Sequence, residues 1–386
     1  MHSTLAEQIT TLYERDMRVG AKAVAATDVP CTYEAMTPEW LTHFMCADTR
    51  GARVTAFRLA SEDDGSTNRR RVFLTYNRVG EEAGLPASVF CKASHALIQR
   101  LNMGLCGAAH GEKMFYTQIR RLLDIEAPRA YHANYDPQSF ASIVILNDMT
   151  DEVEFCSHTT AMNWERAASM ATLMATYHAA MHEHPGLQSA QFALPTLPQF
   201  WQRIEDFVYM KESSNNGFLA AEDVIPERVF RRFPEVWPAT KRAIALHDKL
   251  PRTLVHSDVH LKNWYVRDDV QMGLADWHCC CVGNWSRDFA YAISVALTPQ
   301  NRRQWEQDLL RLYLSETKSR GGLTPSFDEA WDLYRAQLFP ALAFWTNTLC
   351  PSDMQPKDMQ PQDAAREFIR RVACAIDDLE AFEAGE

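Results

Sequence analysis

The sequence predicts an α+β protein in two parts, in which a small antiparallel sheet comes first and a larger, mainly helical region follows. Two observations predict this division. Before residue 148, short segments rich in β-branched and aromatic residues alternate with turn-forming stretches, which is typical of strands. After residue 151, apolar residues recur at the spacing of amphipathic helices. We therefore expect one domain over residues 1–147, with a helical N-terminal extension, and a helical domain over residues 148–386.

The first part should begin with helical structure. Residues 1–24 have a helical pattern, and a short helix is expected near residues 37–45. Strands are expected over residues 52–60, 70–77, 87–94 and 141–149. Residues 111–123 have helical apolar spacing, so at least one helix should be inserted before the last strand.

The second part should be helical with two short interruptions. Helices are expected over residues 163–185, 197–210 and, in part, 229–250. The internal prolines should break the last of these. Short strands are expected around residues 254–258 and 263–277, and helices return from Arg287 onward.

Composition limits the class of partner. The 386 residues are 46% hydrophobic and 23% charged, with a formal net charge of −11. That charge argues against a nucleic-acid partner and mildly favours a cationic or neutral small substrate. No long uncharged run could span a membrane, and no signal peptide is evident. Ten scattered cysteines without an export signal indicate a reduced, cytoplasmic protein.

Residues 256–281 contain three histidines, three adjacent cysteines and several carboxylates, so a metal–thiolate centre has to be considered. Consecutive side chains in an extended chain alternate sides, so Cys279, Cys280 and Cys281 cannot all face one zinc ion. His178 and His182 have the spacing of a helical metal pair, but packing of a helix face explains them better. We expect the cysteines to be small buried residues, and a zinc hydrolase is the remotest alternative.

The carboxylates of this segment fit a different chemistry. Asp258 is followed five residues later by Asn263, and Asp276 comes thirteen residues after that. Phosphoryl transfer needs one carboxylate to accept the proton of the attacking hydroxyl. It also needs an amide oxygen and a second carboxylate to hold Mg²⁺, which prefers oxygen ligands.

Three motifs carry a resemblance to a known family. The first is His256-Ser-Asp-Val-His-Leu-Lys-Asn263, the second is Ala275-Asp-Trp277, and the third runs from Gly283 through Asp288 to Ala290. In this order and spacing they resemble the aminoglycoside phosphotransferase and choline kinase superfamily. The ecdysteroid kinase-like (CHK kinase-like) branch and its bacterial relatives are the most similar. The resemblance covers roughly residues 50–350 and implies a two-lobed, protein-kinase-like fold that uses ATP and Mg²⁺.

The resemblance assigns roles within the second part. It implies Asp258 as the catalytic base and Asn263 and Asp276 as Mg²⁺ ligands. Asp288 is expected to hydrogen-bond the catalytic loop. His260 would either lie near the transferred phosphoryl group or simply stabilise the loop.

The resemblance also assigns the nucleotide side. Lys92 matches the strand lysine that contacts the α- and β-phosphates, and Glu112 matches the helix glutamate that pairs with it. Backbone groups of Asn147 and Met149 would meet the adenine edge. The alternatives are a surface lysine, a solvated helix face and an ordinary buried strand.

One departure concerns the loop that covers the phosphates, which is usually rich in glycine. Residues 60–71 contain only Gly65. Ser66 and Thr67, together with Asn68, are candidates to supply donors. The arginines at 69–71 either add positive charge or form a solvated hairpin face, and the hairpin face is the preferred interpretation.

The expected activity is transfer of the γ-phosphoryl group of ATP to a hydroxyl of a small molecule. Too few residues separate Asp276 from Asp288 for the activation segment that holds a peptide. Aromatic residues of the helical part either line an acceptor pocket or belong to the core; they are Trp201, Trp331, Tyr334 and Trp345. The alternative function is a catalytically silent, nucleotide- or ligand-binding regulator on the same fold.

Overall fold

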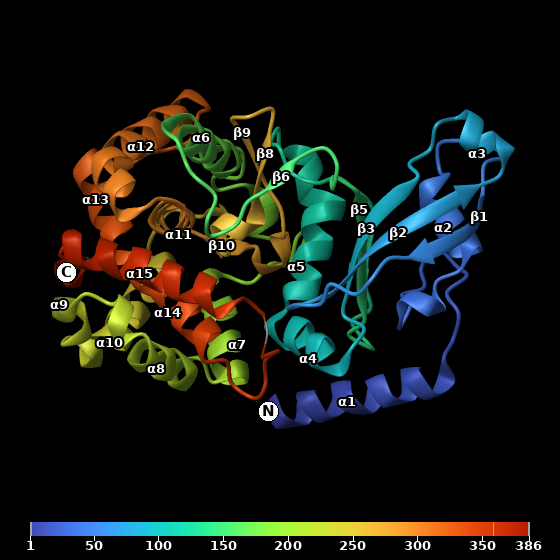
Figure 1. The fold of residues 1–386 in the computed structure, drawn as a ribbon, viewed down its shortest axis with the longest axis horizontal. Helices are drawn as coiled ribbons and strands as arrows, with labels where there is room; N and C mark the ends of the chain where they lie inside the picture. The colour runs from blue at the N-terminus through green and yellow to red at the C-terminus, as the bar shows by residue number, and fades with distance from the viewer. Residues whose placement is uncertain (1, 358, 385–386) are drawn as a thin grey trace. The chain divides into compact units, whose positions relative to one another are not determined.

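The computed structural model describes residues 2–357 and 359–384, which form two compact units (Figure 1). Unit 1 comprises Met1–Arg120, Pro128–Asp151 and Met354–Pro356. Unit 2 comprises Arg121–Ala127, Glu152–Asp353 and Lys357–Glu386. The units therefore divide near residue 151, and a short segment, Arg121–Ala127, packs with unit 2.

Unit 1 contains a five-stranded antiparallel sheet with the strand order β1-β2-β3-β5-β4. The strands are β1 (Val54–Leu59), β2 (Asn68–Tyr76), β3 (Ser88–Ala93), β4 (Ala130–Tyr135) and β5 (Ser142–Asn147). The predicted antiparallel sheet is confirmed, and β4 is a strand that the sequence pattern did not indicate.

Side chains of this sheet alternate between a buried face and a more open one, as the pleat requires. The buried face packs against helix α2 (Pro38–Met45), whose Trp40 and Leu41 are fully buried with Val72 and Ile145 of the sheet. Thr37 caps α2 by accepting a hydrogen bond from the amide of Trp40.

The other helices of unit 1 are α1 (His2–Val19), α3 (Arg78–Glu82), α4 (Leu97–Cys106) and α5 (Ala108–Met114). Helix α4 was not predicted. It ends at Gly107, whose φ of 78° is the left-handed conformation that glycine adopts freely. Helix α5 starts directly afterwards and continues into a π-helical turn, Phe115–Ile119, and a 3₁₀ turn, Arg120–Leu122. The predicted helix over residues 111–123 is thus confirmed, although its hydrogen bonding changes along its length.

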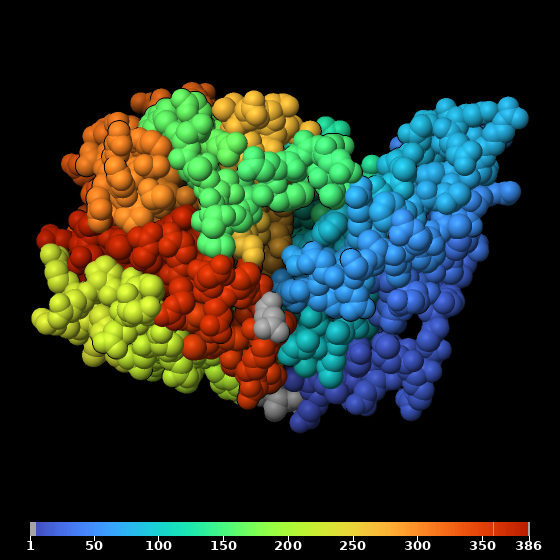
Figure 2. All heavy atoms as spheres, in the orientation of Figure 1, coloured from blue at the N-terminus to red at the C-terminus, as the bar shows by residue number. Residues whose placement is uncertain are grey.

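Unit 2 is mainly helical, as predicted. Its helices are α6 (Trp164–Ala180), α7 (Leu197–Val208), α8 (Met210–Ala220), α9 (Glu227–Phe230), α10 (Phe233–Ala245), α11 (Ser286–Ala296), α12 (Pro299–Ser319), α13 (Phe327–Ala336), α14 (Leu338–Leu349) and α15 (Gln362–Asp378). On the face drawn in Figure 2, the red C-terminal helices α14 and α15 lie beside the yellow-green helices α8–α10. No helix of the described ranges is long and apolar enough to cross a membrane.

The expectation that prolines interrupt residues 229–250 was wrong for Pro238, which lies inside α10. Pro234 lies in the first turn of that helix, where a missing amide hydrogen costs nothing. Pro238 removes the donor for the Pro234 carbonyl, but both prolines are exposed, so water can solvate that carbonyl.

Two small sheets of unit 2 flank the predicted catalytic loop. Strand β7 (Thr253–Val255) pairs with β10 (Cys281–Gly283). Strand β8 (Trp264–Arg267) pairs with β9 (Gln271–Leu274) and with the short β6 (Glu154–Phe155). The loop from His256 to Asn263 therefore begins at one ladder and ends at the other.

Candidate active site

The loop between β7 and β8 is held by hydrogen bonds to the first turn of α11. The carboxylate of Asp288 accepts the amides of His256 at 2.7 Å and of Ser257 at 2.8 Å. Arg287 donates to the carbonyl of Ser257 at 2.8 Å. The expected hydrogen bonding of Asp288 to the loop is confirmed.

Ser257 stands where the family motif has glycine, and its backbone shows why. Its φ is +67°, in the left-handed region that a residue with a Cβ enters only at a cost. The side chain is fully buried, and its hydroxyl has no hydrogen-bond partner in the described part of the chain. The bonds from Asp288 and Arg287 hold this strained turn in place.

Asp258 follows this turn and lies next to the predicted metal ligand Asn263. The Asn263 amide donates to the Asp258 carbonyl at 2.8 Å and to its carboxylate Oδ2 at 3.3 Å. The hydroxyl of Tyr291 on α11 approaches the other carboxylate oxygen at 3.3 Å. The Asp258 side chain remains 15% exposed, so a substrate can reach a carboxylate whose direction is fixed.

Asp276 lies two residues after the end of β9, and its neighbour Ala275 is tied to the same loop by hydrogen bonds. The amide of Ala275 donates to the Asn263 carbonyl at 2.8 Å, and His256 Nε2 donates to the Ala275 carbonyl at 2.9 Å. Asp276 itself has a φ of +64°. The structure therefore brings Asp258, Asn263 and Asp276 together within one hydrogen-bonded assembly of unit 2.

His278 forms an ion pair with Asp276 that sequence analysis missed. Its Nδ1 contacts Asp276 Oδ1. Burial acts to lower the pKa of His278, but the adjacent Asp276 carboxylate outweighs it and raises that pKa well above its ordinary value. The two-residue spacing of Asp276 and His278 was the available signal.

The two histidines of the loop itself are held in a desolvated environment. Burial lowers the pKa of both His256 and His260, which favours their neutral forms. His260 is buried with its ring edge-on to Trp345, at 5.2 Å between ring centroids, and its Nε2 lies 3.6 Å from Asp258 Oδ2. This packing favours the loop-stabilising interpretation of His260.

The side-chain oxygen atoms of Asn263 and Asp276 are suitable ligands for a hard cation. The amide nitrogen of Asn263 is occupied by Asp258, which leaves the side-chain oxygen as the atom that a metal would take. Together with the carboxylate of Asp276, this gives the oxygen ligands that Mg²⁺ prefers.

A second group of possible ligands consists of Asp258, His278 and Cys279, whose ligand atoms lie within 4.8 Å of one another. Burial raises the pKa of the Cys279 thiol, which disfavours the thiolate that zinc requires. All three adjacent cysteines are buried, as expected. His178 accepts from Tyr313 and contacts Asp288 at 3.2 Å, so it is part of the loop's support.

In unit 1, the predicted pair of Lys92 and Glu112 is present. Lys92 Nζ of β3 lies 2.6 Å from Glu112 Oε1 of α5, and both side chains are buried. Neither alternative, a surface lysine or a solvated helix face, is compatible with this burial. A lysine held in this way is oriented by its carboxylate partner.

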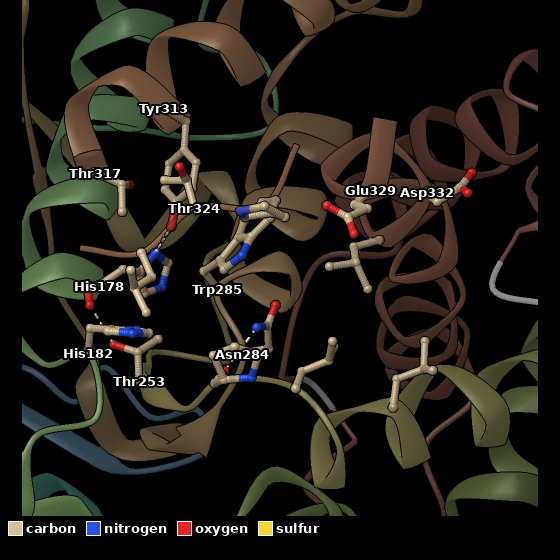
Figure 3. Close-up of a pocket in the computed structure, with 16 residues that line it drawn as sticks. His178, His182, Thr253, Asn284, Trp285, Tyr313, Thr317, Thr324, Glu329 and Asp332 are labelled. Carbon is tan, nitrogen blue, oxygen red and sulfur yellow. Dashed lines mark hydrogen bonds between the residues drawn. The ribbon is translucent and has the colours of Figure 1, made fainter. Parts of the chain in front are cut away.

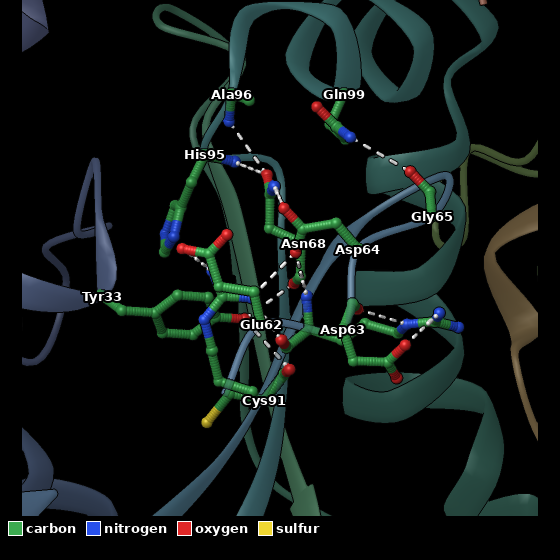
Figure 4. Close-up of polar contacts among 12 residues, drawn as sticks. Tyr33, Glu62, Asp63, Asp64, Gly65, Asn68, Cys91, His95, Ala96 and Gln99 are labelled. Atoms are coloured by element: carbon green, nitrogen blue, oxygen red, sulfur yellow. Dashed lines mark hydrogen bonds and ion pairs between the residues drawn. The ribbon is translucent and has the colours of Figure 1, made fainter. Parts of the chain in front are cut away.

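The glycine-poor loop between β1 and β2 is stabilised by its own polar residues (Figure 4). The Asn68 side chain donates to Asp64 at 2.8 Å and accepts the amides of His95 and Ala96. The amide of Gly65 donates to the carbonyl of Thr67 at 2.9 Å. Thr67 is buried within this turn, whereas Ser66 is half-buried.

The three arginines that follow are neutralised by nearby carboxylates. Arg69 pairs with Asp63 at 2.9 Å, and Arg70 pairs with Asp64 at 2.8 Å. Arg71 pairs with Asp148 and with Asp151. The preferred interpretation as a solvated face was wrong for Arg70, which is 9% exposed because its guanidinium lies between acidic side chains and the ring of Tyr33.

Asn147 and Met149 differ in their backbone bonding. The amide of Asn147 donates to the Arg129 carbonyl at 2.9 Å, and its side chain accepts the amide of Arg129 at 2.7 Å. Within the described residues, the amide and carbonyl of Met149 have no such backbone partner. Met149 is therefore the better candidate of the two for the adenine edge.

A model of the Phosphotransferase enzyme family matches residues 107–324, which is more than half of the sequence. The chain belongs to this family. The match includes Glu112, Asp258, Asn263 and Asp276. Among curated proteins, none matches the sequence.

Several solved structures are similar to this phosphotransferase. A microcompartment-associated aminopropanol kinase is 13% identical, with 88% of this chain and 96% of that one covered and a TM-score of 0.47. The macrolide 2′-phosphotransferase of Brachybacterium faecium is 13% identical over 80% and 91% of the two chains, with a TM-score of 0.46. An ethanolamine kinase of Plasmodium vivax is 11% identical over 84% and 81%, with a TM-score of 0.43.

The aromatic residues that were candidates for an acceptor pocket of this phosphotransferase belong mostly to its core. Trp201 and Tyr334 are fully buried, and Trp345 is 2% exposed. Tyr334 donates to Glu306 at 2.8 Å. Only Trp331 is partly open. Trp201, Tyr334 and Trp345 are therefore core residues, as one of the two interpretations predicted.

Two residues of α11 contribute to the site without any motif that identified them. Tyr291 contacts Asp258, and the fully buried Arg287 lies over the ring of Tyr291 at 4.6 Å while bonding the Ser257 carbonyl. Burial lowers the pKa of Arg287. The only signal in the sequence was the position of Arg287 directly before Asp288.

Proposed function

We propose that the protein is an ATP- and Mg²⁺-dependent phosphotransferase that moves the γ-phosphoryl group to a hydroxyl of a small molecule. The observation that carries the proposal is the hydrogen-bonded assembly of Asp258, Asn263 and Asp276. It supplies one partly exposed carboxylate and, beside it, two oxygen ligands for a cation.

In this reaction Asp258 accepts the proton of the acceptor hydroxyl. A new bond forms between the acceptor oxygen and the γ-phosphorus, and the bond from that phosphorus to the β,γ-bridging oxygen breaks to release ADP. Asn263 and Asp276 would hold Mg²⁺, which neutralises charge on the phosphates. The Asn263 amide keeps the Asp258 carboxylate directed, because it bonds both the backbone and the side chain of that residue.

The nucleotide is proposed to use Lys92, held by Glu112, for the α- and β-phosphates, and the backbone of Met149 for the adenine edge. Asn147 is proposed to contribute to the nucleotide site indirectly. Its side chain accepts the amide of Arg129, and this bond fixes the end of β5. Ser66 and Thr67 are proposed to donate hydrogen bonds to the phosphates. They lie in the loop between β1 and β2, whose turn is stabilised by the bond from Asn68 to Asp64.

A small acceptor is supported by the segment that follows Asp276. Residues 277–290 form a 3₁₀ turn, strand β10 and the first part of α11, and all of them are buried. This segment offers no extended surface on which a peptide could lie. The specific relation to the ecdysteroid kinase-like branch stays a prediction. A cytoplasmic location is proposed from the ten cysteines, none of which forms a disulfide in the described residues.

The experiment is an ADP-release screen of hydroxyl-bearing small molecules with Mg·ATP, using wild type, Asp258→Asn and the control Asp268→Asn. Asp268 lies in the exposed turn between β8 and β9. Loss of a general base lowers turnover by about 10²–10⁴-fold, whereas the control should match wild type. Mg·ATP binding without transfer to any acceptor would point instead to the silent regulator, and equal turnover of Asp258→Asn would refute the role of Asp258.

A further inference from the structure

A cavity of about 560 Å³ lies within unit 2, and its lining includes Thr253 before the predicted catalytic loop and Asn284 and Trp285 after it (Figure 3). Its walls come from the end of α6, the segment before β7, the start of α11, the end of α12 and the start of α13. Its volume falls in the range of about 300–1,000 Å³ that is usual for sites of small organic ligands. None of the residues proposed to bind nucleotide or metal lines it.

The lining of this cavity is mostly apolar. It includes Leu246, Leu250, Pro251, Leu323 and Leu333, together with the ring of Trp285. Trp285 stacks on Tyr313 with ring centroids 4.9 Å apart, which gives the cavity an aromatic wall. Leu323 is 73% exposed, the highest value among the large apolar side chains of the described residues. An apolar ligand would cover this leucine and remove it from water.

Two polar groups at one end of the cavity can bond a ligand. Nε2 of His182 is buried and makes no hydrogen bond with the described residues. The buried hydroxyl of Thr317 interacts with the hydroxyl of Tyr313 without forming a hydrogen bond of normal geometry. Thr317 is only 5% exposed. Figure 3 shows Thr317 and His182 on one side of the cavity and the carboxylates of Glu329 and Asp332 on the other. Buried polar groups without partners are costly, so a ligand that bonds them would gain affinity.

We propose that this cavity is a second ligand site, distinct from the phosphotransfer site, for a neutral and largely apolar small molecule with one hydrogen-bonding group. The apolar body lies against Trp285 and the leucines, and the polar group bonds Thr317 and His182. At the opposite side, the carboxylate of Glu329, which accepts from Ser326, disfavours an acid, whereas Asp332 is paired with Arg335 at 2.8 Å. This inference does not depend on the proposed function, because it uses only the residues of the cavity.

The cavity shares two side chains with the support of the catalytic loop. Tyr313 bonds His178 at 2.9 Å, and His178 contacts Asp288 at 3.2 Å. Asp288 in turn accepts the amides of His256 and Ser257. A ligand that packs against Tyr313 and His178 therefore stabilises the bonds that hold the loop, and its occupancy is transmitted to residues 256–258.

The binding test uses 1-naphthol as the neutral probe and 1-naphthoate as the matched anion, measured by titration calorimetry on the full chain. Wild type should bind 1-naphthol saturably, and 1-naphthoate at least tenfold more weakly. Leu333→Trp fills the cavity and should weaken 1-naphthol binding at least tenfold. Leu314→Trp, the same change on a half-buried leucine of α12 outside the lining, should leave it unchanged.

A further variant tests the polar end. His182→Phe keeps an aromatic ring but removes both ring nitrogens, so 1-naphthol should bind about threefold to tenfold more weakly. The proposal is overturned if wild type shows no saturable binding, if Leu333→Trp binds as wild type does, or if the anion binds as well as the neutral probe.

The transmission to the loop has its own readout. Bound 1-naphthol should slow hydrogen exchange of the amides of His256 and Ser257. Tyr313→Phe keeps the aromatic wall but removes the hydroxyl that bonds His178, so it should retain binding and lose this slowing. Unchanged exchange at these amides in saturated wild type would overturn the link to the loop.

Discussion

The side-chain amide of Asn263 donates to the backbone carbonyl of Asp258 at 2.8 Å, and this bond joins the proposed metal ligand to the proposed base. Because the amide nitrogen is used in this way, the amide oxygen is left for a cation. One residue thus directs the carboxylate and presents a ligand atom.

Asn263→Ala should raise the Mg²⁺ concentration needed for half-maximal ADP production by about tenfold or more, since it removes one oxygen ligand and the bond to Asp258. The control is Asn301→Ala, whose asparagine lies on α12 and bonds the Met162 carbonyl. An unchanged Mg²⁺ requirement in Asn263→Ala would remove Asn263 from the metal site.

Lys92→Met should destabilise the protein by roughly 3–5 kcal/mol, because it leaves the buried Glu112 carboxylate without its partner. Urea unfolding gives the measurement. The double variant Lys92→Met/Glu112→Leu should recover most of this stability but not the affinity for Mg·ATP. Recovery of both would mean that the pair is structural only.

Ser257→Gly should stabilise the protein by about 1 kcal/mol, because glycine adopts the φ of +67° without the strain of a Cβ. The same change at Ser294, within α11, should cost about 1 kcal/mol, since glycine disfavours a helix interior. Thermal unfolding of the two variants compares them directly. A destabilised Ser257→Gly would show that the serine has a contact that offsets the strain.

Stability should fall as the pH decreases below about 6.5, and His247 gives a defined part of this loss. Burial lowers the pKa of His247 to about 4, and its Nδ1 accepts the amide of Asn284 at 2.9 Å, so the folded protein holds it neutral. The unfolded chain takes up a proton at the ordinary pKa near 6.5, so stability is complete above that pH and falls toward pH 4.

Between pH 7 and pH 5 this residue accounts for about 2 kcal/mol. The variant His247→Gln, which keeps an acceptor but cannot be protonated, should lose correspondingly less stability over this interval in urea unfolding. Equal pH dependence of the two proteins would contradict a neutral, buried His247.

Cys279→Ser should keep Mg²⁺-dependent turnover within about threefold of wild type, because oxygen ligands and not the thiol are proposed to hold the cation. Elemental analysis of the purified protein provides the second measurement. Stoichiometric zinc that is lost in Cys279→Ser would support the alternative group of Asp258, His278 and Cys279.

Local sequence patterns were sufficient for the residues whose chemistry depends on spacing along the chain. The motif from His256 to Asn263 and the later Asp276 identified the loop, and the structure joins them through backbone bonds. The pairing of Lys92 with Glu112 was predicted only through the family resemblance, and the structure places the two side chains 2.6 Å apart. Helix α4 and strand β4 were not predicted.

The sequence by itself determined the α+β class and the succession of a strand-rich and a helical part, and it identified the loop residues that are proposed to hold a cation, because periodicity and motif spacing are local properties. Only the tertiary structure decided that His278 pairs with Asp276, that Tyr291 reaches Asp258, and that Arg69–Arg71 are neutralised. The cavity lined by Trp285 was also found only in the tertiary structure. These features depend on burial and on contacts between distant segments, which set desolvation and pairing and leave no periodic trace in the sequence.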